Sequence, residues 1–473
     1  MTERIPRLRT IRYFYQISGM ILGLGLIGFW QANAQIEDSL QQNTETWYQF
    51  RPLNKFTLRS YFLKSEYPAL TYRLENSDGD AIERGWNSYF SFEGDGGAFE
   101  RLSFSYELEA SQQRPVSLRK ASVKLSDYGI SFEVGRGSIW MGHGYHGSLL
   151  LSNNAEPFAF VKFQTTKPFR IPYIGTFEYF LFNGWPQDFK IIGQRLSWHP
   201  MDWLEIGGNQ TSVYTANYKW WEFFRVFSAE NANAGNPRYN TDMRASMDIA
   251  VSLKPLHKFF PFIDDGKIYY EYAGEDLYAY WQVEDKLWVG PLGFQFLDTG
   301  ESYGLFLQSR NTSIRVEYSQ DYRNRFLFHN FKGELGGYND FTWKWYVQPG
   351  PMGFVNGGAV MGHHMGTQAD DLFLQWEYTH RSVNLSLFYD RERHALVNFA
   401  TWPWSLSPYP EYRYQYGAKV QMRYNNWTVL GWIMMNYYKN VSLSDNVMDI
   451  KPIPRRDAKE NIVGLILSYS LDQ

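Results

Sequence analysis

Apolar and polar residues alternate at every second position through most of the chain, and this alternation predicts β-strands. One face of the segment 412–424 is apolar with aromatic ends: Tyr412, Tyr414, Tyr416, Ala418, Val420, Met422 and Tyr424. The opposite face holds polar, charged or glycine residues: Arg413, Gln415, Gly417, Lys419, Gln421 and Arg423. The segments 383–390 and 463–471 repeat the pattern. Such strands suit a barrel with lipid outside and water inside.

Two kinds of connection separate the predicted strands, namely short turns and long loops. Short turns are predicted at 126–129, 199–202, 309–313, 379–382 and 424–427. Long connections are predicted near 137–156, 214–242, 282–301, 321–370, 392–411 and 439–461. In bacterial outer-membrane barrels the short turns face the periplasm and the long loops face outward. A last strand that ends in the periplasm puts every connection on its expected side. We therefore expect an all-β, antiparallel transmembrane barrel of roughly eighteen strands, with loops folded into its lumen.

The first 34 residues have the pattern of a secretory signal. Arginines at positions 4, 7, 9 and 12 precede the apolar run GMILGLGLIGFW, and Ala32 and Ala34 form an Ala-x-Ala cleavage site. An uncleaved anchor is the alternative. We expect residues 1–34 to be the signal peptide, 35–68 a short periplasmic segment and 69–473 the barrel. Within 35–68, a short helix is predicted with Asn54 as its N-cap and an apolar face of Leu58, Phe62 and Leu63.

Composition narrows the class of protein. The 473 residues include 35 Tyr, 35 Phe and 18 Trp, yet the mean hydropathy is −0.44, so the aromatic residues are dispersed among polar ones. The absence of cysteine excludes thiolate catalysis, Cys-based zinc sites and a lipid-modified N-terminal Cys. Without the signal the net charge moves from −3 to −6, because residues 1–34 carry four Arg and one Glu. This charge gives no support for a nucleic-acid partner.

The stretch GRGSIWMGHGYHGSLLLSNNAEPF, residues 135–158, falls on a predicted outward connection. A connection this apolar is not expected to extend into water. Its glycines permit positive φ and close backbone approach, and Asn153 and Asn154 can bond to local backbone groups. We therefore expect the loop to fold into the lumen as a constriction. Ligand binding within the same folded loop is compatible with this interpretation.

Two histidine pairs raise the question of metal binding or catalysis. His143 and His146 lie in one Gly-rich loop, and His363 and His364 lie in another, shortly before Asp370 and Asp371. Together they could build a metal site, but nothing in the sequence links the two loops, so we expect no bound metal and no cofactor. Ser148 or Ser152 with a nearby histidine could support hydrolysis. The chain has no Gly-x-Ser-x-Gly pattern, and we expect no enzyme activity.

The stretch 135–158 resembles the signature of the capsule assembly protein Wzi family, which carries Trp-Trp-Gly-Pro-Gly followed by Ser-Leu-Leu-Leu-Ser-Asn-Asn-Ala-x-Pro. The chain keeps these residues of the motif: Trp140, Gly142, Gly144, Ser148, Leu149, Leu150, Leu151, Ser152, Asn153, Asn154, Ala155 and Pro157. It departs from the motif at Met141 and His143. The segments 193–210 and 361–372 are also similar to the family, and the resemblance covers roughly residues 85 to 460. Residues 35–68 are too few for the family's N-terminal helical bundle.

The resemblance implies an outer-membrane lectin that tethers capsular polysaccharide in a Gram-negative envelope. Aromatic and basic residues in the predicted outer loops fit this role, because aromatic faces stack on sugar rings and cations pair with acidic groups. The candidate binding residues are Trp220, Trp221, Arg225, Trp402, Trp404 and Arg413. The same aromatics could instead form the interface girdle or the cores of folded loops, and a passive porin is the alternative function. The expected partners are capsular polysaccharide, outer-membrane lipid and the barrel-insertion machinery, with the protein a monomer.

Overall fold

The computed structural model of the chain describes residues 48–67, 71–112, 115–214, 241–279, 294–323, 325–327, 329–330, 354–398, 405–407, 410–441 and 456–471. The predicted signal peptide lies outside these residues. So do five of the six candidate binding residues: Trp220, Trp221, Arg225, Trp402 and Trp404. Among the described residues, no helix is long and apolar enough to cross a membrane.

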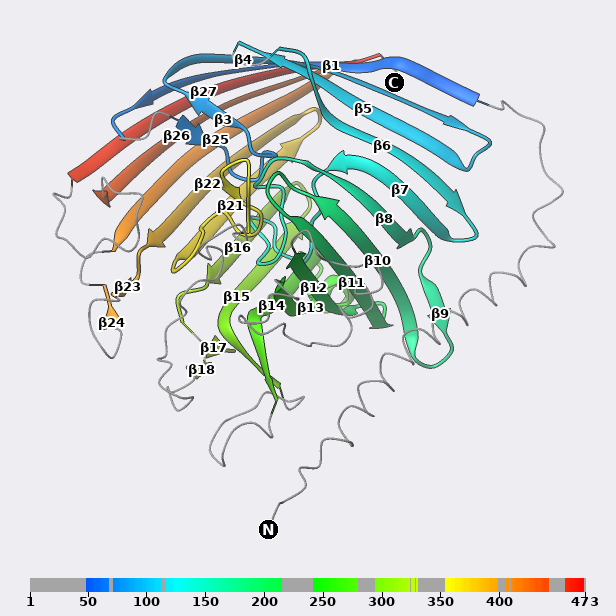
Figure 1. Cartoon of the computed structure of the whole chain (residues 1–473). Helices are drawn as coiled ribbons and strands as arrows, with labels where there is room; N and C mark the ends of the chain where they lie inside the picture. The colour runs from blue at the N-terminus through cyan, green and yellow to red at the C-terminus, as the bar shows by residue number, and fades with distance from the viewer. Residues whose placement is uncertain are drawn as a thin grey trace.

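Eighteen antiparallel strands form a closed barrel, as the alternation predicts (Figure 1). The wall strands are β1 (Tyr48–Ser65), β4 (Gly85–Ala98), β5 (Leu102–Ser111), β6 (Ser117–Asp127), β7 (Ile130–Gly137), β8 (Phe158–Thr165), β10 (Gly175–Trp185), β11 (Lys190–Met201), β12 (Leu204–Tyr214), β13 (Thr241–Ser252), β14 (Asp265–Ala279), β15 (Phe294–Ser309), β16 (Thr312–Gln320), β21 (Asp370–His380), β22 (Val383–His394), β25 (Glu411–Tyr424), β26 (Trp427–Val441) and β27 (Arg456–Ser470). The barrel closes where β1 pairs with both β27 and β4. Short β9 (Phe169–Ile171) pairs with the start of β10.

The two faces of the wall follow the predicted alternation. In β25, Tyr416 and Met422 are each 48% exposed on the outer surface, whereas Gln415 between the tyrosines is 1% exposed in the lumen. In β22, Leu387 is 45% exposed while its neighbour Ser386 is buried. Lipid therefore surrounds the apolar face, and the polar face lines the interior.

The five predicted short turns are confirmed, because each joins two neighbouring antiparallel strands at one end of the barrel. Longer turns at the same end contain β9 and the 3-10 helix η3 (Lys254–Lys258). The six predicted long connections all join strands at the opposite end, which we call the outer end. Near the turn between β25 and β26, the rings of Phe56, Trp427 and Tyr469 cluster with centroids 4.8 to 5.9 Å apart. This is the interfacial placement of aromatics that is typical of membrane barrels.

The structure corrects the prediction for the described part of residues 35–68. The predicted helix from Asn54 is wrong, because residues 48–65 form wall strand β1. Tyr61 and Leu63 point into the lumen and are buried, so they share a face at period 2. The helical pattern combined Leu58 and Phe62 with Leu63, which lies on the opposite face of the strand. The barrel therefore begins by Tyr48 instead of at residue 69.

Within the part of the chain that the structure describes, three connections fold into the lumen, and we call them together the plug. They are residues 66–67 and 71–84 between β1 and β4, residues 138–157 between β7 and β8, and residues 354–369 before β21. The first contains the hairpin β2 (Thr71–Arg73) and β3 (Ala81–Glu83), and the third contains β19 (Val355–Asn356) and β20 (Ala359–Val360). Other small hairpins, β17 (Arg325–Phe326) with β18 (His329–Asn330) and β23 (Val397–Asn398) with β24 (Ser405–Leu406), belong to outer connections.

The plug has an apolar core of its own. Met141 and Leu149–Leu151 from the second segment pack with Phe354, Met361 and Met365 from the third. Wall residues Phe160, Phe182 and Ile191 complete this cluster. The predicted folding of the Gly-rich loop into the lumen is confirmed.

Candidate functional site

The Gly-rich segment 138–157 turns sharply because three of its glycines occupy positions that a side chain would obstruct. Gly142 has φ of +127°, a conformation that other residues rarely adopt, and a Cβ there would lie 2.7 Å from Glu271. A Cβ on Gly147 would lie 2.3 Å from the ring of His363. Gly144, between them, is buried, and a Cβ there would clash with the carbonyl oxygen of Gly147. The glycines thus let the loop fold tightly and bring it against the third plug segment.

Glu317 of β16 anchors the tip of this loop to the wall. Its carboxylate accepts hydrogen bonds from the backbone N–H groups of Tyr145 (2.7 Å), His146 (3.1 Å) and Gly147 (3.2 Å). Successive N–H groups that converge on one carboxylate make charge-assisted bonds. This contact fixes the direction in which the His146 side chain leaves the backbone.

The Ser-Asn-Asn part of the motif joins the three plug segments. The Ser152 hydroxyl donates to the carbonyl of Gly362 (2.6 Å), and the Asn154 amide donates to the carbonyl of Val360 (3.0 Å). The Asn153 amide donates to the carbonyl of Asn76 in the first segment (2.9 Å). Nearby, the buried Ser148 hydroxyl donates to the carbonyl of Met141, and Pro157 is buried at the start of β8. These motif residues therefore hold the plug together.

Trp140 has a different environment, because it lines a pocket of about 410 Å³ between the plug and the wall. The pocket lies against the lumenal faces of β5 to β8, near the outer ends of β7 and β8. Its lining combines aromatic and charged side chains: Trp140, Phe160, Lys120, Arg136, Lys162, Asp78 and Glu133. A half-buried tryptophan beside cations is a suitable surface for a sugar ring that carries acidic groups.

The charges in this pocket are partly paired within the protein. Lys120 Nζ lies 2.5 Å from Asp78, and Lys162 Nζ lies 3.0 Å from Glu133. Arg136 differs, because its buried Nε makes no hydrogen bond with any described residue. Its guanidinium lines the pocket and supplies a cation there.

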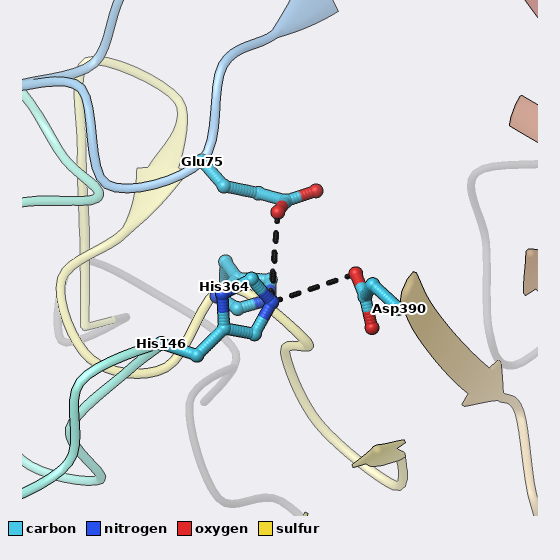
Figure 2. Close-up of side chains that lie close together, drawn as sticks. All are labelled: Glu75, His146, His364 and Asp390. Atoms are coloured by element: carbon cyan, nitrogen blue, oxygen red, sulfur yellow. Dashed lines mark ion pairs between the residues drawn. The ribbon is translucent and has the colours of Figure 1, made fainter. Parts of the chain in front are cut away.

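A second polar centre lies where the plug meets β21 and β22 (Figure 2). His146 Nε2 lies 3.5 Å from Asp390 Oδ2, 3.6 Å from Asp371 Oδ2 and 3.7 Å from Glu75 Oε2. His364 Nε2 lies 3.1 Å from Glu392 Oε1, 3.3 Å from Asp371 Oδ2 and 3.9 Å from Glu75 Oε2. The rings of His146 and His364 have centroids 4.4 Å apart. We call these six residues the histidine–carboxylate cluster.

The two adjacent histidines of the third plug segment are in opposite electrostatic situations. Burial lowers the pKa of His364, but the charge of Glu75 and the contacts with Asp371 and Glu392 outweigh it and raise the pKa well above its ordinary value. Burial, with the neighbouring His364 and His146, lowers the pKa of His363 well below its ordinary value. His363 is thus neutral at pH 7.

His143 belongs to a separate group of charges. Its Nε2 lies 3.0 Å from Asp248 Oδ1 and 3.5 Å from Glu205 Oε1, and its Nδ1 lies 2.8 Å from Lys267 Nζ. Arg195 binds the same two carboxylates, with Nη1 2.6 Å from Asp248 and Nη2 3.0 Å from Glu205. The cations of the protein already neutralise this group.

Arg413, the candidate binding residue that the structure describes, points into the lumen. Its guanidinium contacts the carboxylates of Glu75 and Glu392 and donates to the hydroxyl of Tyr72 (2.6 Å). Asp370, from the predicted metal set, lies apart from the histidine–carboxylate cluster and binds Arg393 Nε (2.8 Å). The structure thus brings together His146, His363, His364 and Asp371 of the histidine-pair hypothesis, and separates His143 and Asp370 from them.

Sequence reasoning missed Glu75, Asp390 and Glu392. Asp390 carried one local signal, because its position on the polar face of 383–390 is predicted from the alternation. Glu75 carried none, since it lies between wall strands β1 and β4, outside the segments of clear alternation.

Comparisons with known proteins identify the family of the chain. A family model described as capsule assembly protein Wzi matches residues 66–447. Among solved structures, Wzi from Escherichia coli, described as a carbohydrate-binding β-barrel involved in group 1 capsule assembly, is 12% identical with a TM-score of 0.58, covering 89% of this chain and 85% of that one. OpdL of Pseudomonas aeruginosa is 10% identical with a TM-score of 0.47, and OccAB2 of Acinetobacter baumannii is 9% identical with a TM-score of 0.47. Each of these two similarities covers 89% of this chain and 98% of the other chain. The comparison with curated protein sequences found no match.

Proposed function

Because the chain belongs to the capsule assembly protein Wzi family, we propose that it binds capsular polysaccharide at the cell surface and so supports capsule assembly. The barrel places the protein in the outer membrane. The Escherichia coli member is described as carbohydrate-binding, and its 12% identity to this chain supports a shared fold alone. The proposal therefore depends on what the residues of this chain can bind.

The observation that carries the proposal is the pocket at Trp140. Trp140 and Phe160 supply two aromatic rings, and Lys120, Arg136 and Lys162 supply cations. Stacking of an aromatic face on a sugar ring is typically worth on the order of 1 kcal/mol, so a repeating polymer gains affinity from several weak contacts. The pocket thus suits an acidic polysaccharide better than a neutral one.

The plug weighs against the alternative of a passive porin. A diffusion channel needs a continuous aqueous path, whereas here three segments pack in the lumen around buried Met141, Leu149 and Phe354. Hydrogen bonds from Ser152 and Asn154 link the second segment to the third. Such a packed interior does not open without breaking apolar contacts.

We further propose that the protein acts by binding and not by catalysis. Ser148 and Ser152, the candidate nucleophiles, each donate their hydroxyl proton to a backbone carbonyl in the plug. A hydroxyl held in this way is not hydrogen-bonded to a histidine base. Outer-membrane lipid and the barrel-insertion machinery remain the other expected partners, with the protein a monomer.

Two measurements on the purified full chain test the function. In surface plasmon resonance, immobilised protein should bind an acidic capsular polysaccharide, and binding should weaken with added salt. A neutral polysaccharide of similar length is the control. In planar bilayers the protein should show no stable open conductance. A large steady conductance without polysaccharide binding would support the porin instead.

A further inference from the structure

Four side chains from four different parts of the chain aim at one space in the lumen (Figure 2). They are Glu75, His146, His364 and Asp390, and their nearest nitrogen and oxygen atoms all lie within 4.8 Å of one another. We propose that this group binds a divalent transition-metal cation, with Zn²⁺ as the representative ion. His146 and His364 would supply imidazole nitrogens, and Glu75 and Asp390 would supply carboxylate oxygens.

The spacing of the donor atoms fits a shared cation. Zinc bonds to nitrogen and oxygen are about 2.0–2.2 Å long, which places tetrahedral ligand atoms about 3.3–3.6 Å from one another. His146 Nε2 lies 3.5 Å from Asp390 Oδ2 and 3.7 Å from Glu75 Oε2, and His364 Nε2 lies 3.9 Å from Glu75 Oε2. These separations exceed hydrogen-bond length and need only a small contraction to meet one ion. Asp371 Oδ2 is placed as a fifth donor, 3.6 Å from His146 and 3.3 Å from His364.

Three of the four proposed ligands also have buried donor atoms without a hydrogen bond. Within the part of the chain that the structure describes, the following buried atoms have no hydrogen-bond partner: His146 Nε2, both ring nitrogens of His364, and both carboxylate oxygens of Asp390. The side chains of His146, His364 and Asp390 are 9%, 3% and 0% exposed. Buried polar groups without hydrogen bonds cost free energy, and coordination to a metal removes this cost.

The charge balance favours a cation as well. The histidine–carboxylate cluster contains four carboxylates: Glu75, Asp371, Asp390 and Glu392. Arg413 binds Glu75 through Oε1 and Glu392 through Oε2, which leaves Oε2 of Glu75 facing the histidines. Lys419 also interacts electrostatically with Glu75. Among the described residues, no lysine or arginine lies within 4.0 Å of Asp371 or Asp390. A divalent cation would neutralise this adjacent buried pair.

The donor set selects the class of metal. Imidazole nitrogens with carboxylate oxygens and no thiolate suit Zn²⁺ and other first-row divalent cations. Calcium and magnesium prefer oxygen donors throughout, so two imidazoles disfavour them. His143 with Asp248 and Glu205 has similar spacing, but Arg195 and Lys267 already occupy that group, so we assign it no metal.

A metal here would join all three plug segments to the wall. Glu75 comes from the first segment, His146 from the second, His364 from the third, and Asp390 from wall strand β22. A ligand that binds only the folded arrangement stabilises it. The ion would therefore hold the plug closed, a structural role that stands independently of polysaccharide binding.

The test uses the full chain, unfolded in urea with a chelator and refolded in detergent with either ZnCl2 or CaCl2. After desalting, atomic emission spectroscopy should find about one zinc ion per chain and no retained calcium. The double variant H146Q/H364Q should lose the zinc. The matched control H143Q, which changes a histidine of the same loop, should keep it. Heat-modifiable migration on gels shows which variants contain a folded barrel.

Three results would overturn the proposal: no zinc in the native-sequence protein, zinc retained by the folded double variant, or equal loss from H143Q. If the double variant does not fold, Co²⁺ replaces the variant test in the native-sequence protein. Low-coordinate cobalt with nitrogen and oxygen donors absorbs strongly in the visible range. Such a spectrum supports the site, and the weak spectrum of hydrated cobalt would reject it.

Discussion

The hydroxyl of Ser152 donates a 2.6 Å hydrogen bond to the carbonyl of Gly362, which lies 210 residues further along the chain. The backbone N–H of Ser152 donates to the neighbouring carbonyl of Met361 (2.8 Å), so the contact is a two-bond junction between two plug segments. The Ser152 side chain also accepts a bond from the Asn154 N–H (3.1 Å). A single motif serine thus connects two loops that the chain order keeps apart.

Replacing Ser152 by alanine should loosen the plug without opening the barrel. The change leaves a buried carbonyl and a buried N–H without this partner, at a cost of about 1–3 kcal/mol. Hydrogen exchange of peptides from 138–157 and 354–369 should accelerate by roughly 5- to 150-fold. The control S313A removes a wall hydroxyl bound to Glu377 and should leave exchange in the plug unchanged. Equal protection in S152A and the native-sequence protein would show that the junction does not hold the loops.

Local patterns in the sequence could predict part of the fold, whereas contacts between remote segments could not be predicted. The contrast between lipid and water is a local signal, so the faces of β22 and β25 and the short turns follow from alternation alone. Residues 55–65 also alternate, but their apolar residues fit a helical spacing as well, and the pairing of β1 with β27 that decides between them is remote in sequence. Local patterns favoured the wrong element there.

The histidine–carboxylate cluster could not be predicted for a related reason. His146 and His364 lie in different loops, and their 4.4 Å ring separation depends on Glu317, Ser152 and the glycines of the motif. No periodic pattern in the sequence predicts any of these contacts. The composition of the two loops suggested metal chemistry, and only the folded lumen shows which histidine joins it.

Asp321 gives a prediction about pH. It follows β16 directly, and burial, with help from Asp370, raises its pKa well above the ordinary value even though the N–H groups of Ala369 and Gln368 lower it. The folded chain therefore keeps a proton that the unfolded chain releases above about pH 4. This contribution to stability is complete below that pH and is lost as the pH rises toward the raised pKa. D321N removes the titration, so its urea midpoint should fall less between acidic and neutral pH. Parallel pH profiles for the two proteins would contradict a protonated Asp321.

Replacing Arg413 tests whether this residue stabilises the fold or binds polysaccharide. It is paired with buried Glu75 and Glu392, so R413A should destabilise the folded protein by about 3–5 kcal/mol, because two buried carboxylates lose their counter-ion. The control R423A changes an exposed arginine of the same strand and should shift the unfolding free energy by no more than about 0.5 kcal/mol. Urea titrations in detergent measure both. A stable R413A protein with weak polysaccharide binding would instead support the sequence-based hypothesis that Arg413 contacts the ligand.

Substitution of tryptophans tests where the polysaccharide binds. Trp402 and Trp404, which lie outside the described residues, are the sugar-binding tryptophans that the sequence predicts in one outer loop, whereas the pocket favours Trp140. One stacking contact is worth on the order of 1 kcal/mol, so W140A should weaken binding about five-fold if the pocket is the site. W86A, which removes an exposed tryptophan from the lipid-facing side of β4, is the control for loss of an aromatic ring.

The comparison of W140A with W402A/W404A then separates the two sites. If the pocket holds the polymer, cells with W140A should release capsule into the medium while W402A/W404A cells retain it, at equal surface levels of protein. The reverse pattern would assign the site to the outer loop and leave Trp140 a structural residue of the plug. Because Arg136 lines the same pocket and supplies a cation, R136A should reproduce the W140A effect and should also reduce the salt dependence of binding. A polymer bound through both groups would thus contact the segment that carries the family motif.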